Sequence, residues 1–140
     1  MADVSAQDLK DLAQARLLDA RLLLQNGRHS AAYYLAGYVV EMTLKACIAR
    51  QFRSGVLPDL KLVRETYSRD LDKLLMLARL RLQFDEARKL DTRLSANWAI
   101  VSNWSVESRY ELVDPVKAVA MVNAVAEEPS EVFQWLQKHW

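Results

Sequence analysis

Two charged residues stand alone in the most apolar long segment of the chain. Within residues 31–49 only Glu41 and Lys45 carry charge, and they are four positions apart. On a helix this spacing places both side chains on one face, with the acid first, which favours an ion pair. A buried carboxylate must be paired or protonated. Two interpretations stay open: a brace in which Glu41 holds Lys45 or the distant Arg109, and a polar pocket in which Glu41, Arg109 and Tyr110 contact a nucleotide or phosphate.

The other reactive residue types do not form a catalytic or metal-binding pattern. Both histidines, His29 and His139, are expected at helix ends, where a surface role is common, and no Glu stands three residues before either of them. The single cysteine, Cys47, excludes an internal disulfide and the usual zinc spacings, and its apolar surroundings predict an inert core thiol. The chain has no Gly-rich phosphate loop and no nucleophile elbow. We therefore expect no catalytic residue, no metal and no cofactor.

Composition predicts the elements that must position these residues. The chain has 140 residues, of which 51% are hydrophobic and 26% charged, with only 3 glycines and 3 prolines. This size and composition predict one domain over residues 1–140 with a single core. The scarcity of turn residues and the abundance of Leu and Ala predict an all-α fold. We expect an antiparallel, up-and-down bundle of about five helices.

Capping signals and hydrophobic periodicity place the first helices. Ser5 with Asp8 resembles a capping box and opens the first helix, which Asn26-Gly27 ends. His29 or Ser30 is expected to cap the second helix, whose apolar residues on nearly all sides predict a central position. Gly37, in the middle of that helix, suggests that another backbone approaches closely there.

The second half of the chain gives weaker signals. Residues 54–68 are expected to form a connection with one short helical turn, followed by a third helix over 71–82 capped by Asp70. A fourth helix is predicted from about residue 85 to 100 or 103, and 105–113 is predicted as a loop. Asp114 and Pro115 form a good helix start, and Pro129 is expected to break or kink the last helical stretch.

Three segments together resemble the signatures of the HEPN domain family. Gly27-Arg28-His29 followed by AAYYLAGYVVEMTLKACI is similar to the first signature. Ser68-Arg69-Asp70-Leu71-Asp72-Lys73-Leu74-Leu75 is similar to the second, and Trp104-Ser105-Val106-Glu107-Ser108-Arg109-Tyr110 to the third. The resemblance spans roughly residues 9–138 and implies a small helical bundle. The candidate polar site then comprises Glu41, Lys45, Arg69, Asp70, Arg109 and Tyr110.

Two departures from the family pattern matter for function. Arg69 replaces the His that usually stands in the second signature. Family ribonucleases carry an Arg followed after four to six residues by a His, and neither histidine here has an Arg at that distance. Leucines occupy positions 22–24 before His29, and Val132, Phe133 and Gln134 precede His139. The resemblance therefore implies a non-catalytic binding or interaction module, possible ligands being a nucleotide or RNA. A ribonuclease with a degenerate site around Arg109 stays the alternative.

Charge and assembly complete the expectations. The net charge is +1, but residues 50–93 hold 11 basic and 7 acidic residues and 105–140 hold 3 and 6. This asymmetry predicts either solvated helix faces or a basic surface for RNA or an acidic partner.

Without a signal peptide or a membrane-length apolar run, we expect a cytoplasmic protein and no membrane contact. The resemblance implies a homodimer and a nucleotidyltransferase partner, as in toxin–antitoxin pairs. The proposed dimer contacts are Tyr33, Tyr34, Trp135 and Trp140.

Overall fold

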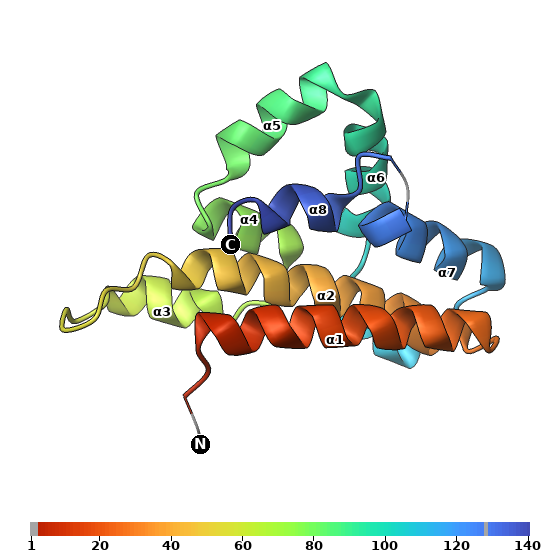
Figure 1. Ribbon diagram of the computed structural model, residues 1–140, viewed down its shortest axis with the longest axis horizontal. Helices are drawn as coiled ribbons and strands as arrows, with labels where there is room; N and C mark the ends of the chain where they lie inside the picture. Colours follow the sequence, from red (N-terminus) through yellow and green to blue (C-terminus); the bar gives the residue numbers. More distant parts are fainter. Residues whose placement is uncertain (1–2, 128) are drawn as a thin grey trace.

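The computed structural model describes residues 3–127 and 129–140, and within them every regular element is helical. The all-α prediction is thus confirmed, whereas the expected number of about five helices was too low. Figure 1 shows the arrangement. The elements in chain order are α1 (Ala6–Gln25), α2 (His29–Ala49), α3 (Leu60–Thr66), α4 (Leu71–Leu77), α5 (Arg81–Leu90), α6 (Thr92–Ser102), the 3-10 helix η1 (Val106–Tyr110), α7 (Pro115–Val122), the π-helical turn η2 (Asn123–Glu127) and α8 (Val132–Gln137).

The first two helices form an antiparallel pair, side by side along the molecule (Figure 1). The Ser5 hydroxyl accepts a hydrogen bond from the Asp8 N–H while the Asp8 carboxylate accepts one from the Ser5 N–H, as expected for a capping box. Gly27 ends α1 with a positive φ of 75°, and the turn is closed by backbone bonds from Gly27 and Arg28 to the last carbonyls of α1. The sequence signals for both ends of this helix are confirmed.

Helix α2 occupies the centre of the fold, as its composition predicts. It contacts α1, α4, α7 and α8, and 13 of its 21 residues are buried. The expected cap was wrong, because Arg28 takes the N-cap position without a side-chain bond. The Ser30 hydroxyl instead accepts a hydrogen bond from the Val113 N–H at 2.8 Å. Gly37 does meet a close neighbour, but the neighbour is the indole ring of Trp104 rather than a backbone.

The predicted third and fourth helices are each shorter than expected, because local hydrogen bonds end them early. The third ends at Leu77, where Arg79 adopts a positive φ of 60° and closes a Schellman turn that directs Leu80 into the core. The fourth is interrupted at Asp91, whose carboxylate accepts bonds from two N–H groups of α6 and so starts a new helix. The expected connection over 54–68 holds the seven-residue α3, capped by Asp59.

The C-terminal third follows its sequence signals more closely. Asp114 caps α7 and Pro115 occupies its first turn, as predicted. Pro129 was expected to break or to kink the last helical stretch, and the structure shows a break. Helix α7 continues into η2, and α8 begins only at Val132. Ser130 lies between them with a positive φ of 61°.

Helices α5 and α6 form an outer layer over α8 (Figure 1), where the Phe84 ring meets the Trp98 and Trp135 rings edge-on. None of the described helices is long and apolar enough to cross a membrane.

Candidate functional site

Glu41 lies buried between two cations, and one of them comes from a distant helix start. Its side chain is 5% exposed; Oε2 lies 3.3 Å from Lys45 Nζ, and Oε1 accepts a hydrogen bond from Arg69 Nε at 2.7 Å. The ion pair with Lys45 agrees with the i, i+4 prediction. The second partner is Arg69, which precedes the N-cap of α4, and not Arg109. We refer to Glu41, Lys45 and Arg69 as the charged triad.

Aromatic side chains surround the Arg69 guanidinium. Its Nη2 donates a hydrogen bond to the Tyr34 hydroxyl at 2.9 Å, and its Cζ lies 5.9 Å from the Tyr34 ring centre, 5.4 Å from that of Tyr38 and 5.9 Å from that of Trp104. Burial disfavours the charged guanidinium, but the hydrogen bonds to Glu41 and Tyr34 outweigh it and raise the pKa of Arg69 above its usual value. Arg69 is thus a permanent cation held in an aromatic cage.

The triad has an excess of positive charge in a partly buried place. One carboxylate and two cations leave a net charge of +1, while the side chains of Lys45 and Arg69 remain 18% and 28% exposed. A buried carboxylate with two charge-assisted partners is well satisfied, so the brace interpretation of Glu41 accounts for its burial. The same arrangement leaves Lys45 able to contact a second anion that approaches from solvent.

Glu41 and Lys45 also line a pocket of about 520 Å³ between α1, α2 and α3. This volume lies in the range of small-molecule sites, which are mostly apolar with a few polar groups. Aromatic rings of Tyr38, Phe52 and Tyr67 provide stacking surfaces around it. The remaining lining residues are Asp3, Val4, Leu9, Leu12, Met42, Ala49, Pro58, Val63 and Thr66. The pocket therefore combines one cation, two carboxylates, aromatic rings and an apolar wall.

The remaining members of the predicted site lie elsewhere. Asp70 caps α4, where its carboxylate accepts a hydrogen bond from the Lys73 N–H at 3.1 Å. Arg109 lies over the ring of Tyr110, with 4.8 Å from Cζ to the ring centre, and both side chains are exposed. Within the described residues neither forms a hydrogen bond or ion pair with Glu41. The structure thus brings Glu41, Lys45 and Arg69 together and leaves Asp70, Arg109 and Tyr110 outside the triad.

Several residues of this site were missed at the level of the sequence. Tyr34 and Tyr38 are four positions apart on α2 and so share a helix face, and their rings stack with centres 6.3 Å apart. Nothing in the sequence assigned them to a cation, and Trp104 reaches the cage from the end of α6, where its indole N–H donates to the Tyr34 carbonyl at 3.2 Å. Tyr67 follows α3, an element expected only as one turn. A partner in a separate helix leaves no signal in local periodicity.

Burial shifts the pKa of two side chains of reactive types, Cys47 and His139. Cys47 lies in the core with Sγ 3.7 Å from the Leu136 carbonyl oxygen, and burial raises the pKa of its thiol to about 11. Burial, together with the charges of Arg50 and Lys138, lowers the pKa of His139. Among the described residues no group of three or more His, Cys, Asp or Glu side chains is placed to hold a metal ion.

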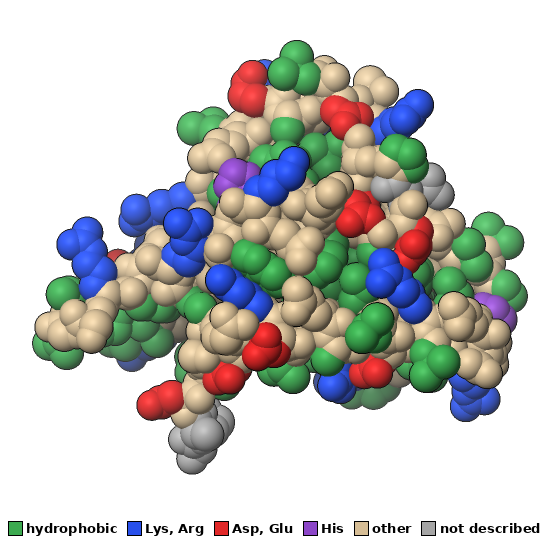
Figure 2. Space-filling view, in the orientation of Figure 1, with side chains coloured by type: hydrophobic (Ala, Val, Ile, Leu, Met, Phe, Trp, Pro, Cys, Tyr) green, Lys and Arg blue, Asp and Glu red, His purple; other side chains and the backbone are tan. Residues whose placement is uncertain are grey.

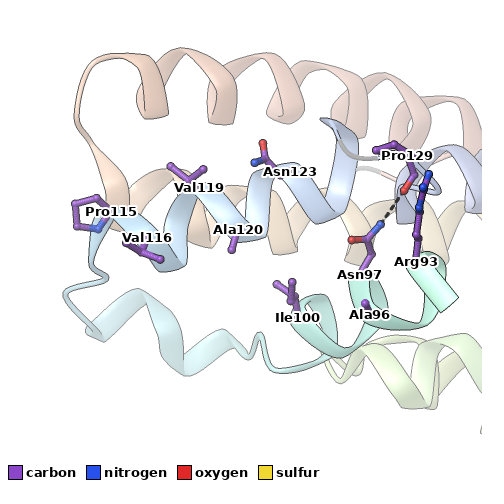
Figure 3. Close-up of a pocket in the computed structure, with 10 residues that line it drawn as sticks. All are labelled: Arg93, Ala96, Asn97, Ile100, Pro115, Val116, Val119, Ala120, Asn123 and Pro129. Atoms are coloured by element: carbon purple, nitrogen blue, oxygen red, sulfur yellow. Dashed lines mark hydrogen bonds between the residues drawn. The ribbon is translucent and has the colours of Figure 1, made fainter.

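A second hollow, of about 820 Å³, lies between α6 and α7 on another part of the molecule (Figure 3). Ile100, Val116 and Val119 line it with apolar surface. Asn97 stands at one end, where its amide donates hydrogen bonds to the carbonyls of Pro129 and Ser130. Three polar side chains line this hollow, Arg93, Asn97 and Asn123, and it has no aromatic ring for stacking, unlike the pocket beside the triad.

Comparison with known proteins agrees with the signatures noted in the sequence. The family model described as HEPN domain matches residues 6–139, nearly the whole chain. No curated protein and no solved structure gave a significant match. A HEPN match indicates a nucleotide-binding or RNA-related function. With its three signature segments, its helical fold and this match, the chain belongs to the HEPN domain family.

Proposed function

We propose that this protein is a non-catalytic HEPN binding module that holds a nucleotide in the pocket between α1, α2 and α3. The observation that carries the proposal is a lysine at an aromatic-lined pocket, Lys45, whose partner Glu41 is also held by a second cation, Arg69. Lys45 lines the pocket together with the carboxylates of Glu41 and Asp3, and Arg69, outside the lining, holds the Glu41 carboxylate. A nucleotide supplies both a planar base and an anionic phosphate.

The fit is chemical as well as electrostatic. Tyr67 is 72% exposed, and its ring lines the pocket together with those of Tyr38 and Phe52, so a base can stack there without a change of the core. Lys45 then provides a charge-assisted contact for the phosphate. Arg69 holds Glu41 from the other side and prevents that carboxylate from neutralising Lys45 alone.

The non-catalytic part of the proposal rests on the absent Arg–His spacing in the sequence. The alternative is a ribonuclease centred on Arg109, and such an enzyme needs a proton-transfer group beside that guanidinium. In the described structure the neighbour of Arg109 is the Tyr110 ring. This favours binding over cleavage. Cleavage of single-stranded RNA by the purified protein that disappears in Arg109→Ala would establish the alternative instead.

Calorimetric titration with AMP and with ATP tests the nucleotide proposal. We expect saturable binding, and Lys45→Gln should weaken it by about tenfold or more, the value of one contact to a charged group. Tyr67→Ala, at an exposed position, should weaken it without loss of folding. Lys89→Gln is the matched control, since Lys89 is an exposed cation on α5 with its own partner Glu86. Absence of binding in the folded wild type, or an equal effect of Lys89→Gln, would refute the proposal.

Assembly is the second part of the proposal: a homodimer, with a nucleotidyltransferase as protein partner. Tyr33 is excluded as a dimer contact, because only 2% of it is exposed in a single chain and Lys117 covers its ring. Exposed apolar side chains such as Leu112 and Val116 provide other surface for association. Sedimentation equilibrium should give twice the chain mass of 16.1 kDa. A concentration-independent mass near 16.1 kDa would exclude the dimer.

A further inference from the structure

Three cations from separate elements lie around the C-terminal end of the chain. Lys10 of α1 lies with its Nζ 5.7 Å from the ring centre of Trp140, and Arg50 at the end of α2 donates a hydrogen bond to the His139 carbonyl at 2.7 Å. Lys138 ends α8, next to His139. Figure 2 shows Lys and Arg side chains gathered on the left half of the visible face, where the C-terminus lies. We call Lys10, Arg50 and Lys138 the basic end.

Acidic side chains do not neutralise the basic end. Within the described residues none of its three cations takes part in an ion pair, in contrast to Arg21, which pairs with Glu127. The helix dipole stabilises a cation at the C-terminus of a helix, and this accounts for Arg50 at the end of α2 and Lys138 at the end of α8. The dipole does not account for Lys10, which lies in the second turn of α1, far from the C-terminus of that helix. The charge therefore exceeds what the helices need.

Half-buried aromatic rings lie among these cations. The His139 imidazole lies 4.5 Å from the Trp135 ring, and the Trp140 ring meets Phe133 edge-on at 5.7 Å. Trp135, His139 and Trp140 are all partly accessible to solvent. Cations interleaved with accessible aromatic rings are the pattern of surfaces that bind single-stranded nucleic acid, where phosphates contact the cations and bases stack on the rings.

We infer that the basic end is a binding surface for single-stranded nucleic acid, with the backbone phosphates against Lys10, Arg50 and Lys138 and a base against the rings of Trp140 or His139. An acidic peptide satisfies the cations but leaves the aromatic rings unused, so nucleic acid is the better match. This surface shares no residue with the charged triad. The inference therefore does not depend on nucleotide binding in the pocket.

Fluorescence anisotropy with a labelled oligouridylate of about twelve nucleotides tests the inference. Three phosphate contacts predict that the logarithm of the association constant falls with the logarithm of salt concentration with a slope of about −2. Replacing Lys10, Arg50 and Lys138 together by Gln should weaken binding by about tenfold or more at low salt and bring the slope close to zero. Tryptophan fluorescence should change on binding, because the rings lie at the surface that is covered.

Matched controls separate this surface from total charge and from the pocket. The triple replacement of Lys61, Lys89 and Arg93 by Gln removes the same charge from α3, α5 and α6 and should leave binding unchanged. Lys45→Gln should also leave binding of the oligouridylate unchanged, although this substitution weakens nucleotide binding in the pocket. Equal loss in the two triple variants would overturn the inference. So would equal competition by polyglutamate and by unlabelled RNA, which would indicate a surface for acidic proteins.

Discussion

Removal of the Glu41 carboxylate is the most informative test of the charged triad. Glu41→Ala leaves Lys45 and Arg69 without their shared anion, and breaking a buried pair in this way typically costs 3–5 kcal/mol of unfolding free energy, to order of magnitude. Both cations retain some contact with water, at 18% and 28% side-chain exposure, so we expect the lower end, about 3 kcal/mol. Glu41→Gln keeps an acceptor for the Arg69 Nε–H and should cost only about half as much.

Urea denaturation followed by circular dichroism measures these differences in the free energy of unfolding. Glu86→Ala is the matched control, because Glu86 forms an i, i+3 pair with Lys89 on the exposed side of α5. It should change stability by less than about 1 kcal/mol. If Glu41→Ala cost no more than Glu86→Ala, the triad would not be a buried, coupled unit, and the electrostatic reasoning for the pocket would fail with it.

Three further predictions concern the core and the C-terminal end. Gly37→Ala should destabilise the fold by about 1–3 kcal/mol in urea denaturation, because the added Cβ would lie 2.3 Å from atoms of the Trp104 ring; an unchanged unfolding midpoint would contradict this packing. Cys47 should react with a thiol reagent at neutral pH only as fast as the protein opens, since the pKa of its buried thiol is about 11, and rapid stoichiometric labelling of the native protein would contradict its burial. Since the pKa of His139 is lower in the fold than its ordinary 6.5, the unfolded chain binds more protons as pH falls through 6.5. Stability should therefore decrease on acidification in this range, and less steeply in His139→Gln; identical pH profiles would refute this contribution.

Much of the local structure follows from the sequence alone. Ser5 and Asp114 start helices because their side chains satisfy N–H groups that the helix itself cannot. Gly27 ends α1 because it adopts the left-handed conformation at little cost. These signals act between residues a few positions apart. The same local reading missed the breaks at Arg79 and Asp91, since leucine-rich periodicity continues through both positions.

The composition of α2 likewise predicted its central place, and the pairing of Glu41 with Lys45 follows from one helical turn. Tertiary structure decided the second partner of Glu41, because Arg69 and Arg109 are both distant from it in sequence. The packing of α4 against α2 brings Arg69 Nε to 2.7 Å from Glu41 Oε1. It also decided that Trp104 fills the space above Gly37. Helical periodicity identifies which side chains share a face, whereas contacts between helices depend on how those faces pack, and that is a property of the whole chain.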